Sequence, residues 1–453
     1  MSKRRAAFLT LGCKVNQYET DAMEEILEKN GYDIVSFKET ADVYIINTCS
    51  VTNMADRKSR QMIHRAKKNN PDAVIVAAGC YVQAAEKEMA EKNMADILVG
   101  NNKKKDIAQI LEEYFAVKAV KEEQQVPLVS EVIDINHTKE YEDLTIHKVN
   151  EHTRAYIKIQ DGCNQFCSYC IIPYTRGRIR SKNPEEVIEE VRNLAAQGYK
   201  EIVLTGIHLS SYGKDLGDIT LLDVIQRIQQ IEDVERIRLG SLEPRIITEE
   251  FVKELVKCDK VCPHFHLSLQ SGCDETLKRM NRKYTTEEYE EALNILRKYY
   301  EHPALTTDVI AGFVGETEEE FEKTRAYLEK INLYEMHIFK YSKRAGTRAA
   351  VMSHQVPDPV KTTRSGELLA MEKEQSKRFR AHYLGREAEV LLEEIKELDG
   401  VEYLLGHTRD YVKVAVPLTE NGEKAVTNTV VRGTVEGFVN DEILLLSPLE
   451  FSK

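Results

Sequence analysis

Long apolar runs and tryptophan are both missing from this sequence. None of the 453 residues is tryptophan, and aromatic residues make up 7%. No apolar stretch approaches the roughly 20 residues that cross a bilayer, and the basic start Met1–Arg5 precedes a run that Gly12 interrupts, unlike a signal peptide. With 42% hydrophobic and 30% charged residues, the composition is that of a soluble globular protein. We expect a cytoplasmic protein of about three domains.

An excess of positive charge is also missing. The formal net charge at pH 7 is -12, so any contact with nucleic acid must come from local basic patches and not from the overall field. Nine cysteines without an export signal indicate a reducing compartment. In such a compartment thiols more often bind metals or take part in catalysis than form disulfides.

A fourth metal ligand is absent from the most distinctive stretch, residues 159–173. It carries three cysteines at the spacing C-x3-C-x2-C, namely Cys163, Cys167 and Cys170. A closed structural zinc site needs four protein ligands, whereas three thiolates in a loop suit a cubane iron–sulfur cluster with one iron open to a small molecule. The alternative, three buried cysteines acting as small apolar residues, fits poorly with the polar neighbours Asn164, Gln165 and Ser168.

The first hundred residues alternate short apolar runs with helical patterns. Strands are expected at Ala6–Leu11, Val43–Ile46, Ala73–Ala78 and Ile97–Gly100. This rhythm predicts a doubly wound α/β domain, with a parallel sheet covered by helices on both faces. A cysteine follows each of the first three strands: Cys13, Cys49 and Cys80. Because loops at the carboxyl ends of parallel strands converge, we expect a second three-thiolate cluster site, the alternative being scattered core cysteines.

The middle of the chain predicts six β/α units. Strands are expected at Ala155–Ile159, Glu201–Leu204, Glu235–Leu239, His264–Leu267, Leu305–Ile310 and Glu335–Tyr341. Six units are too few for the eight-stranded barrel and indicate a partial, open (β/α)6 barrel, with its active site at the carboxyl ends of the strands. Polar residues follow four of these strands: Thr205–Gly206, Ser241–Glu243, Ser268–Gly272 and Gly312–Glu316.

The last stretch, from His382, changes to short β-rich segments separated by turns. This spacing is typical of a small antiparallel barrel. From Ala381 onward seven Lys and Arg residues stand against fourteen Asp and Glu residues, so the charge of this part gives no sign of nucleic-acid binding. We expect an N-terminal domain over residues 3–116, a linker over 117–148, a core over 149–379 and the C-terminal barrel over 382–448.

These motifs together resemble the radical S-adenosylmethionine (SAM) methylthiotransferases. The resemblance covers an N-terminal cluster-binding domain, a radical SAM core and a C-terminal TRAM domain. It is carried by the cysteine triplet and by phrases that are specific in sequence: Leu11–Glu19, Asn47–Val51, Thr205–Gly213 and Leu267–Gly272. The phrase Cys13-Lys-Val-Asn16 is most similar to the subgroup that acts on N6-threonylcarbamoyladenosine at position 37 of tRNA, next to the anticodon.

The resemblance implies a role for each matching residue. It implies that Cys163, Cys167 and Cys170 hold the 4Fe-4S cluster that binds SAM, and that Cys13, Cys49 and Cys80 hold an auxiliary 4Fe-4S cluster. The implied SAM pocket consists of Thr205, Gly206, Ser241, Glu243, Gln270, Gly312, Gly315 and Glu316. Val314 departs from the family pattern, which more often has proline there, so this loop is expected to be less rigid.

The implied reaction consumes two SAM molecules, one as methyl donor and one as source of a radical that attacks carbon 2 of the adenine. The base must leave its stack to reach the site, and the tRNA anticodon stem-loop and an electron donor are the expected partners. The expected substrate contacts are Arg176, Arg178, Arg344 and Arg348. Two alternatives stay open: a methylthiotransferase acting on isopentenyl-adenosine in tRNA or on a ribosomal-protein aspartate, and a non-catalytic iron–sulfur protein that binds RNA and senses redox state.

Overall fold

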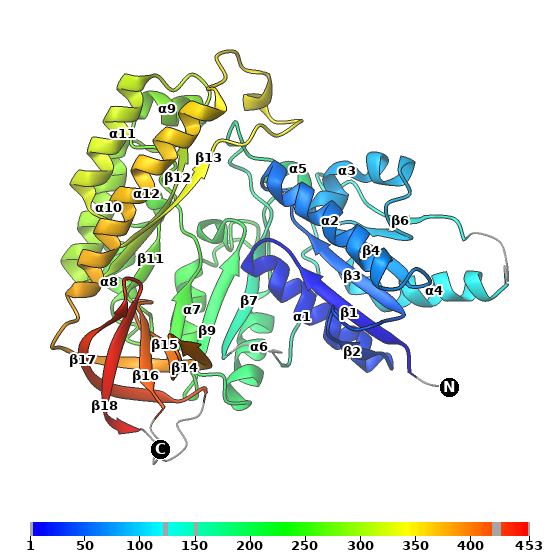
Figure 1. Cartoon of the computed structure of the whole chain (residues 1–453), viewed down its shortest axis with the longest axis horizontal. Helices are drawn as coiled ribbons and strands as arrows, with labels where there is room; N and C mark the ends of the chain where they lie inside the picture. Colours follow the sequence, from blue (N-terminus) through cyan, green and yellow to red (C-terminus); the bar gives the residue numbers. More distant parts are fainter. Residues whose placement is uncertain (1–2, 121–125, 149–152, 419–426, 452–453) are drawn as a thin grey trace.

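The computed structural model describes the chain except residues 1–2, 121–125, 149–152, 419–426 and 452–453. An N-terminal α/β domain lies beside an open barrel of strands, and a small β-barrel lies against one end of that open barrel (Figure 1). The fold class expected from the sequence is confirmed. Residue 149, the expected start of the core, lies outside the described residues. Within the described residues, no helix combines the length and the apolar character that a membrane crossing requires.

The N-terminal domain is built on a six-stranded, wholly parallel sheet. In space the strands follow the order β2-β1-β3-β4-β5-β6. Their bounds are β1 Arg5–Thr10, β2 Asp33–Val35, β3 Val43–Thr48, β4 Val74–Gly79, β5 Ile97–Val99 and β6 Val129–Glu131. Apolar runs predicted four of them. The sequence analysis missed β2 and β6 because three-residue strands at the sheet edges are too short to leave a periodic pattern.

Helices cover both faces of this sheet, as predicted. They are α1 Lys14–Lys29, α2 Asn53–Asn69, α3 Cys80–Glu91 and α4 Ile107–Val120, with a 3-10 turn η1 Lys104–Asp106. One hydrophobic cluster joins α1 and α4 to the sheet, and a second joins α2 and α3 to its other face. With α1 and α4 on one face and α2 and α3 on the other, the carboxyl ends of β1, β3 and β4 lie along one edge of the sheet, where a site can form.

The segment expected to be a linker does more than connect two domains. Its strand β6 pairs in parallel with β5, and Leu144 and Ile146 are buried in the core of the open barrel. Glu142 accepts hydrogen bonds from the backbone of Lys104 and Lys105. Few apolar residues interrupt the charged sequence here, which is why its periodicity did not reveal these contacts.

Six parallel strands form the open barrel, in agreement with the sequence. They are β7 Arg154–Asp161, β9 Glu201–Gly206, β10 Arg236–Leu239, β11 His264–His266, β12 Ala304–Ala311 and β13 Glu335–Lys340, and β8 Arg180–Ser181 pairs antiparallel with β7. The sheets β10-β9-β7-β8 and β11-β12-β13 are joined by isolated bridges such as Leu242 to Leu267. The strand ends therefore meet along one curved edge.

Helices wrap the outside of the open barrel. They are α5 Ile172–Arg176, α6 Pro184–Ala196, α7 Leu221–Gln229, α8 Glu249–Leu255, α9 Asp274–Arg279, α10 Thr286–Tyr299, α11 Glu318–Ile331 and α12 Asp358–Ala381, with 3-10 turns η2 Leu209–Ser211, η3 Pro244–Ile246 and η4 Arg348–Val351. Asn183 caps α6, and Thr317 with Glu320 forms a capping box at the start of α11. Both helix starts were predicted.

The C-terminal strands close into a barrel in the order β14-β15-β16-β18-β17. They are β14 Glu387–Leu398, β15 Val401–Thr408, β16 Lys413–Pro417, β17 Val430–Asn440 and β18 Ile443–Phe451. All pairs are antiparallel except β16 with β18. Arg236 and Arg238 of β10 donate hydrogen bonds to backbone carbonyls of His407 and Arg409 at 3.0 and 2.8 Å. The small barrel thus covers the amino end of the open barrel and leaves the carboxyl ends free.

Candidate functional site

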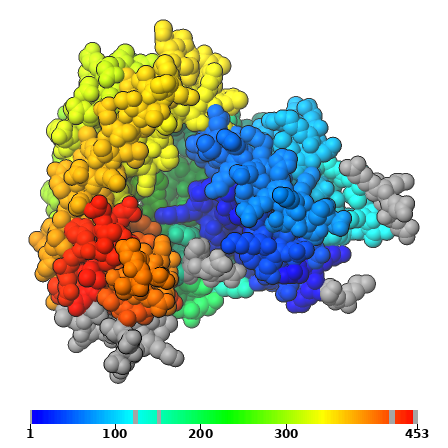
Figure 2. Space-filling model, in the orientation of Figure 1, coloured from blue at the N-terminus to red at the C-terminus, as the bar shows by residue number. Residues whose placement is uncertain are grey.

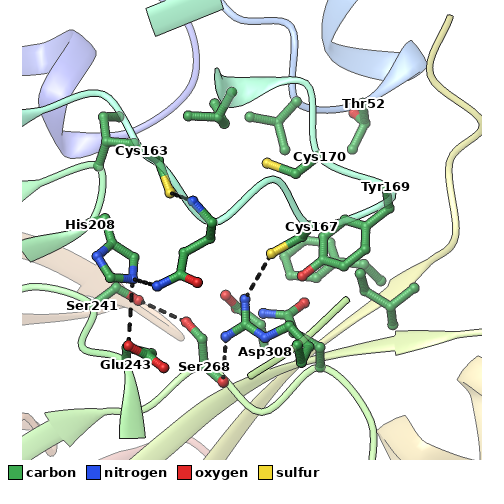
Figure 3. A pocket seen from close by; sticks show the side chains of 18 of the residues that line it. Thr52, Cys163, Cys167, Tyr169, Cys170, His208, Ser241, Glu243, Ser268 and Asp308 are labelled. Carbon is green, nitrogen blue, oxygen red and sulfur yellow. Dashed lines mark hydrogen bonds and ion pairs between the residues drawn. The ribbon is translucent and has the colours of Figure 1, made fainter. Parts of the chain in front are cut away.

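The cysteine triplet lies on the loop after β7 and lines a cavity of about 370 Å³ (Figure 3). The loop turns at Gly162, whose φ is +71° and where a Cβ would lie 1.8 Å from the carbonyl oxygen of Arg178. The backbone N–H of Cys163 donates to the carbonyl of Gly177 at 3.0 Å. Only glycine fits this close backbone approach, which fixes the loop so that all three sulfurs reach the cavity.

The three thiols suit a metal cluster with one open position. Burial raises the pKa of Cys163 to about 11 and that of Cys170 to about 12, so ligation must displace their protons. A guanidinium N–H of Arg282 donates to Cys167 Sγ at 3.2 Å. Among the residues that line the cavity, the triplet supplies three thiols and no other cysteine is present. The one histidine there, His208, is hydrogen-bonded to Ser211. Three thiol ligands fit a cluster whose remaining iron binds a small molecule.

The second cysteine set comes from three adjacent strands. Cys13 follows β1, Cys49 follows β3 and Cys80 follows β4, which are neighbours in the sheet. A Cβ on Gly12 would lie 2.8 Å from Cys49 Cβ, so these two loops touch. Burial, together with the neighbouring thiols of Cys80 and Cys13, raises the pKa of Cys49 to about 11. The convergence expected from the strand ends is therefore present.

The cavity is lined by the triplet and by a segment that follows the second cysteine set. Val51 and Thr52, two and three residues after Cys49, line it, and Figure 3 shows Thr52 beside Cys170. Asn53 at the start of α2 hydrogen-bonds the backbone carbonyl of Lys343 and the hydroxyl of Ser342 beyond β13. The N-terminal domain is thus bonded to the rim of the barrel beside the cavity.

Three of the residues expected at the SAM pocket line this cavity: Ser241, Glu243 and Gln270. Figure 3 shows Ser241 and Glu243 on the wall opposite the triplet. Thr205 and Gly206 do not line the cavity but lie directly before the lining residues Ile207 and His208. A Cβ on Gly206 would lie 2.9 Å from Gln160 Cβ, and Gln160 Oε1 accepts the backbone N–H of His208 at 2.6 Å. Thr205 and Gly206 therefore support the wall, and Ile207 and His208 face the cavity.

The loop after β12 does not follow the expectation. Gly312, Gly315 and Glu316 are not among the residues that line the cavity. Glu316 is buried, accepts the backbone N–H of Gly312 at 2.8 Å and pairs with Arg364 of α12 at 2.9 Å. The loop turns outward against α12, so that Gly312 abuts Lys361. Val314, the departure from the family pattern, is buried with Phe313 and Tyr341.

Several cavity residues were not anticipated. His208 Nδ1 lies 2.6 Å from Ser211 Oγ, and burial lowers the pKa of this imidazole to about 4, so it is neutral near pH 7. Gln165, Arg282 and Asp308 also line the cavity. Asp308 lies in β12 and Arg282 follows α9, and neither belongs to a sequence motif that marks it as a cavity residue. Only the tertiary contact shows which of many such polar residues face inward.

Two of the four arginines proposed as substrate contacts are buried in ion pairs. Arg176 is fully buried and pairs with Glu19 at 2.8 Å and with Asp161 at 3.2 Å. Arg344 is 6% exposed and pairs with Asp56. The expectation that either contacts the substrate is corrected, since their charges join the N-terminal domain to the barrel. Arg178 and Arg348 are exposed.

Family comparisons agree with this architecture. Residues 157–328 match the model of the radical SAM superfamily, and residues 5–100 match that of an uncharacterized protein family, UPF0004. Among solved structures, a radical SAM methyltransferase, TsrM, from Kitasatospora setae is similar in fold, with a TM-score of 0.56 at 16% identity over 77% of each chain. That similarity concerns the fold alone.

Curated relatives are much more similar in sequence. The chain is 43% identical to threonylcarbamoyladenosine tRNA methylthiotransferase MtaB of Bacillus subtilis, over 92% of this chain and 91% of that protein. It is 40% identical to the protein of the same name from Aquifex aeolicus, over 88% and 95%. It is 36% identical to tRNA-2-methylthio-N(6)-dimethylallyladenosine synthase of Moorella thermoacetica, over 95% and 96%. The chain therefore belongs to the radical SAM tRNA methylthiotransferases, enzymes that use SAM and two 4Fe-4S clusters to transfer sulfur-containing groups.

Proposed function

We propose that this enzyme converts N6-threonylcarbamoyladenosine at position 37 of tRNA to its 2-methylthio derivative. The observation that carries the proposal is the cavity lined by the cysteine triplet and by Val51 and Thr52, which lie two and three residues after Cys49. The substrate assignment is supported by the names of the two relatives at 43% and 40% identity, whereas relatives named as dimethylallyladenosine synthases are 36% and 39% identical.

The cofactors are assigned to residues as follows. Cys163, Cys167 and Cys170 would hold the cluster that binds SAM, and Cys13, Cys49 and Cys80 the auxiliary cluster. When bound, these groups supply a carbon radical and a methylated sulfur, chemistry that an aromatic C–H bond requires because it offers no acidic proton or leaving group. The protein contributes placement and exclusion of water.

The residues of the wall act by hydrogen bonding and shape. Ser241, Glu243 and Gln270 would hold the polar groups of SAM, and Thr205 and Gly206 support that wall from behind. At the rim, Phe339 and Val51 are 48% and 52% exposed. Their apolar surface faces the cavity and offers a contact surface for a base that has left its stack in the anticodon loop.

The tRNA would be held by exposed cations at the rim. Arg178 and Arg348 keep this role because they are exposed, and Arg178 lies over the ring of Phe166 at 4.5 Å. The proposal includes an electron donor, since reductive cleavage of SAM consumes an electron, and a cytoplasmic location shared with tRNA.

Nucleoside mass spectrometry tests the substrate. In a strain without this gene, the 2-methylthio form of threonylcarbamoyladenosine should disappear while its precursor accumulates. Persistence of that form would refute the assignment, and loss of the 2-methylthio form of isopentenyl-adenosine would favour the alternative substrate.

The cluster assignment is tested with the reconstituted enzyme. Cys170→Ala should abolish formation of 5′-deoxyadenosine, whereas Cys80→Ala should still form it but give no methylthio product. A non-catalytic redox sensor would form no 5′-deoxyadenosine even as the wild type.

A further inference from the structure

A polar wall lies deeper in the open barrel than the cysteine triplet. His266, Asp308 and His337 lie on the neighbouring strands β11, β12 and β13. Asp308 lines the cavity, as does Phe339, two residues after His337 on the same strand. Because alternate side chains of a strand share a face, His337 points to the same interior space. His266 stands two residues before Ser268, another lining residue, and its ring stacks on that of His337 with centroids 5.6 Å apart.

The three side chains form one cluster that is open to solvent. His266 Nε2 lies 3.3 Å from Asp308 Oδ2, and its Nδ1 lies 3.0 Å from Thr306 Oγ1. The ligand atoms of His266, Asp308 and His337 all lie within 4.8 Å of one another. His337 is exposed and Asp308 is 29% exposed in its side chain. Among the described residues His337 has no hydrogen-bond partner, so its ring nitrogens are free to bind a ligand.

A cation from the N-terminal domain lies near the same buried histidine, His264, as this cluster does. Lys14 follows Cys13 at the start of α1 and is exposed. Its Nζ has no ion pair or hydrogen bond among the described residues and lies 5.8 Å from the ring centroid of Tyr156. The groups share one buried neighbour, His264, whose pKa is lowered mainly by burial and further by Arg238, Lys14 and the two histidines. Figure 2 shows the molecule hollowed between the N-terminal domain, in blue, and the yellow to orange part of the chain.

We propose that Lys14 and His337, with Asp308 held in place by His266, form the subsite that receives the threonylcarbamoyl group of the substrate base. The inference rests on the proposed function and adds the residues that select the substrate. The group ends in a carboxylate, which needs donors such as an ammonium and imidazole N–H groups. Its hydroxyl and urea N–H groups need an acceptor, which Asp308 supplies.

The same wall would reject an isopentenyl group. That group is apolar and would cover the His337 ring and the Lys14 ammonium without giving them hydrogen-bond partners. A site built to hydrogen-bond its substrate discriminates against an analogue that lacks the polar groups, because the bound analogue takes the polar groups of the site out of water and leaves them unpaired. The subsite therefore accounts for selection among methylthiotransferase substrates.

Binding of synthetic anticodon stem-loops tests the subsite. Stem-loops with threonylcarbamoyl-, isopentenyl- or unmodified adenosine at position 37 are titrated with the holoenzyme in the presence of SAM at fixed salt. The wild type should prefer the threonylcarbamoyl stem-loop. His337→Phe, which keeps an aromatic ring, and Lys14→Met should each weaken that affinity by about 10- to 100-fold and leave the affinity for unmodified adenosine as it was. His137→Phe, at a histidine whose side chain is 85% exposed, is the matched control.

The outcomes separate the two proposals. A wild type without preference for the threonylcarbamoyl stem-loop would sink the proposed substrate itself. A wild-type preference that both variants keep would overturn the subsite alone, as would an equal loss of affinity for all three stem-loops. A divalent ion that copurifies with the wild type and is lost from His266→Phe and His337→Phe would assign the wall to a metal instead. The iron content of each variant shows whether it folds and holds its clusters. Lys14 is next to Cys13, so Lys14→Met can lose iron; in that case the result with His337→Phe alone tests the subsite.

Discussion

Glu316 shows how one polar residue at a strand end can serve packing instead of binding. Its carboxylate is 2% exposed, accepts the backbone N–H of Gly312 and pairs with Arg364. The motif around it matches the family, yet the loop faces α12. A carboxylate buried beside a guanidinium stabilises the loop that carries it, and this contribution to folding is independent of any ligand.

Glu316→Gln should therefore lower the stability of the protein and leave SAM binding nearly unchanged. We expect the free energy of unfolding to fall by about 2 kcal/mol, the usual cost of losing a buried hydrogen bond to a charged group, with KM for SAM little changed. Denaturant titration and uncoupled SAM cleavage measure the two effects. Glu318→Gln is the control, since Glu318 also pairs with Arg364 but is 74% exposed in its side chain and should cost under about 1 kcal/mol. A large rise in KM for SAM would instead show that Glu316 contributes to the SAM pocket.

At the scale of elements, β7 connects the cysteine triplet to the N-terminal domain. Asp161 at its end pairs with Arg176 of α5 at 3.2 Å and with Lys158 at 3.4 Å. Glu19 of α1 pairs with Lys158 at 3.0 Å and also with Lys104. Burial opposes ionisation, but Arg176 and the lysines hold the pKa of Glu19 well below its usual range. This network joins α1, β7 and α5 without solvent.

Acid should weaken this joint. Burial raises the pKa of Asp161, but Arg176 and Lys158 prevail and lower it to about 2, from 3.8 for an ordinary Asp. A folded-state pKa below the unfolded value gives stability that is complete above pH 3.8 and is lost as the pH falls toward 2. The contribution is about 2 kcal/mol. The denaturant midpoint of the cluster-free protein should fall as the pH is lowered from 5 to 2, and it should fall less steeply for Asp161→Asn than for the wild type. Parallel curves would show that Asp161 is not linked to folding.

The turn between β4 and α3 positions Cys80 for the auxiliary set. Gly79 has a φ of +96°, and a Cβ there would lie 2.6 Å from Asn47 Oδ1 and 2.9 Å from the carbonyl oxygen of Thr48. Gly79→Ala should displace Cys80 and lower the iron content of the reconstituted protein by about half, since one of two clusters is lost. Gly31→Ala separates the causes, because Gly31 has a φ of +85° but nothing within 4 Å of a Cβ. Equal iron in both variants would contradict the close-contact argument.

At the scale of the whole molecule, the N-terminal domain and the small C-terminal barrel are bonded to opposite ends of the open barrel. The small C-terminal barrel is bonded to the amino end of the open barrel, while the N-terminal domain is bonded to the rim near Ser342. The net charge is -12, so tRNA must be held by local cations that stay exposed. Arg178 and Arg348 meet that condition.

The salt dependence of tRNA binding should report these contacts. Arg178→Gln and Arg348→Gln should each reduce the slope of log affinity against log salt by about one, because each removes one phosphate contact. Filter binding or anisotropy from 50 to 200 mM salt (roughly the range where the effect is large) measures the slope. Arg325→Gln is the control, at an arginine on α11 that pairs with Glu322. A slope that neither rim variant changes would place the RNA elsewhere.

The sequence by itself determined four strands of the N-terminal sheet, the six parallel strands of the open barrel and the two cysteine sets. These features are local: apolar runs mark the strands, and Cys13, Cys49 and Cys80 each follow one closely. Tertiary structure alone decided which polar residues are buried. Arg176 pairs with Glu19, 157 positions earlier, and Lys14 lies 5.8 Å from the ring centroid of Tyr156 in another domain. Pairings between distant segments depend on how domains dock, and no periodic pattern encodes docking, because one side chain can lie at a surface or at an interface with the same neighbours in sequence.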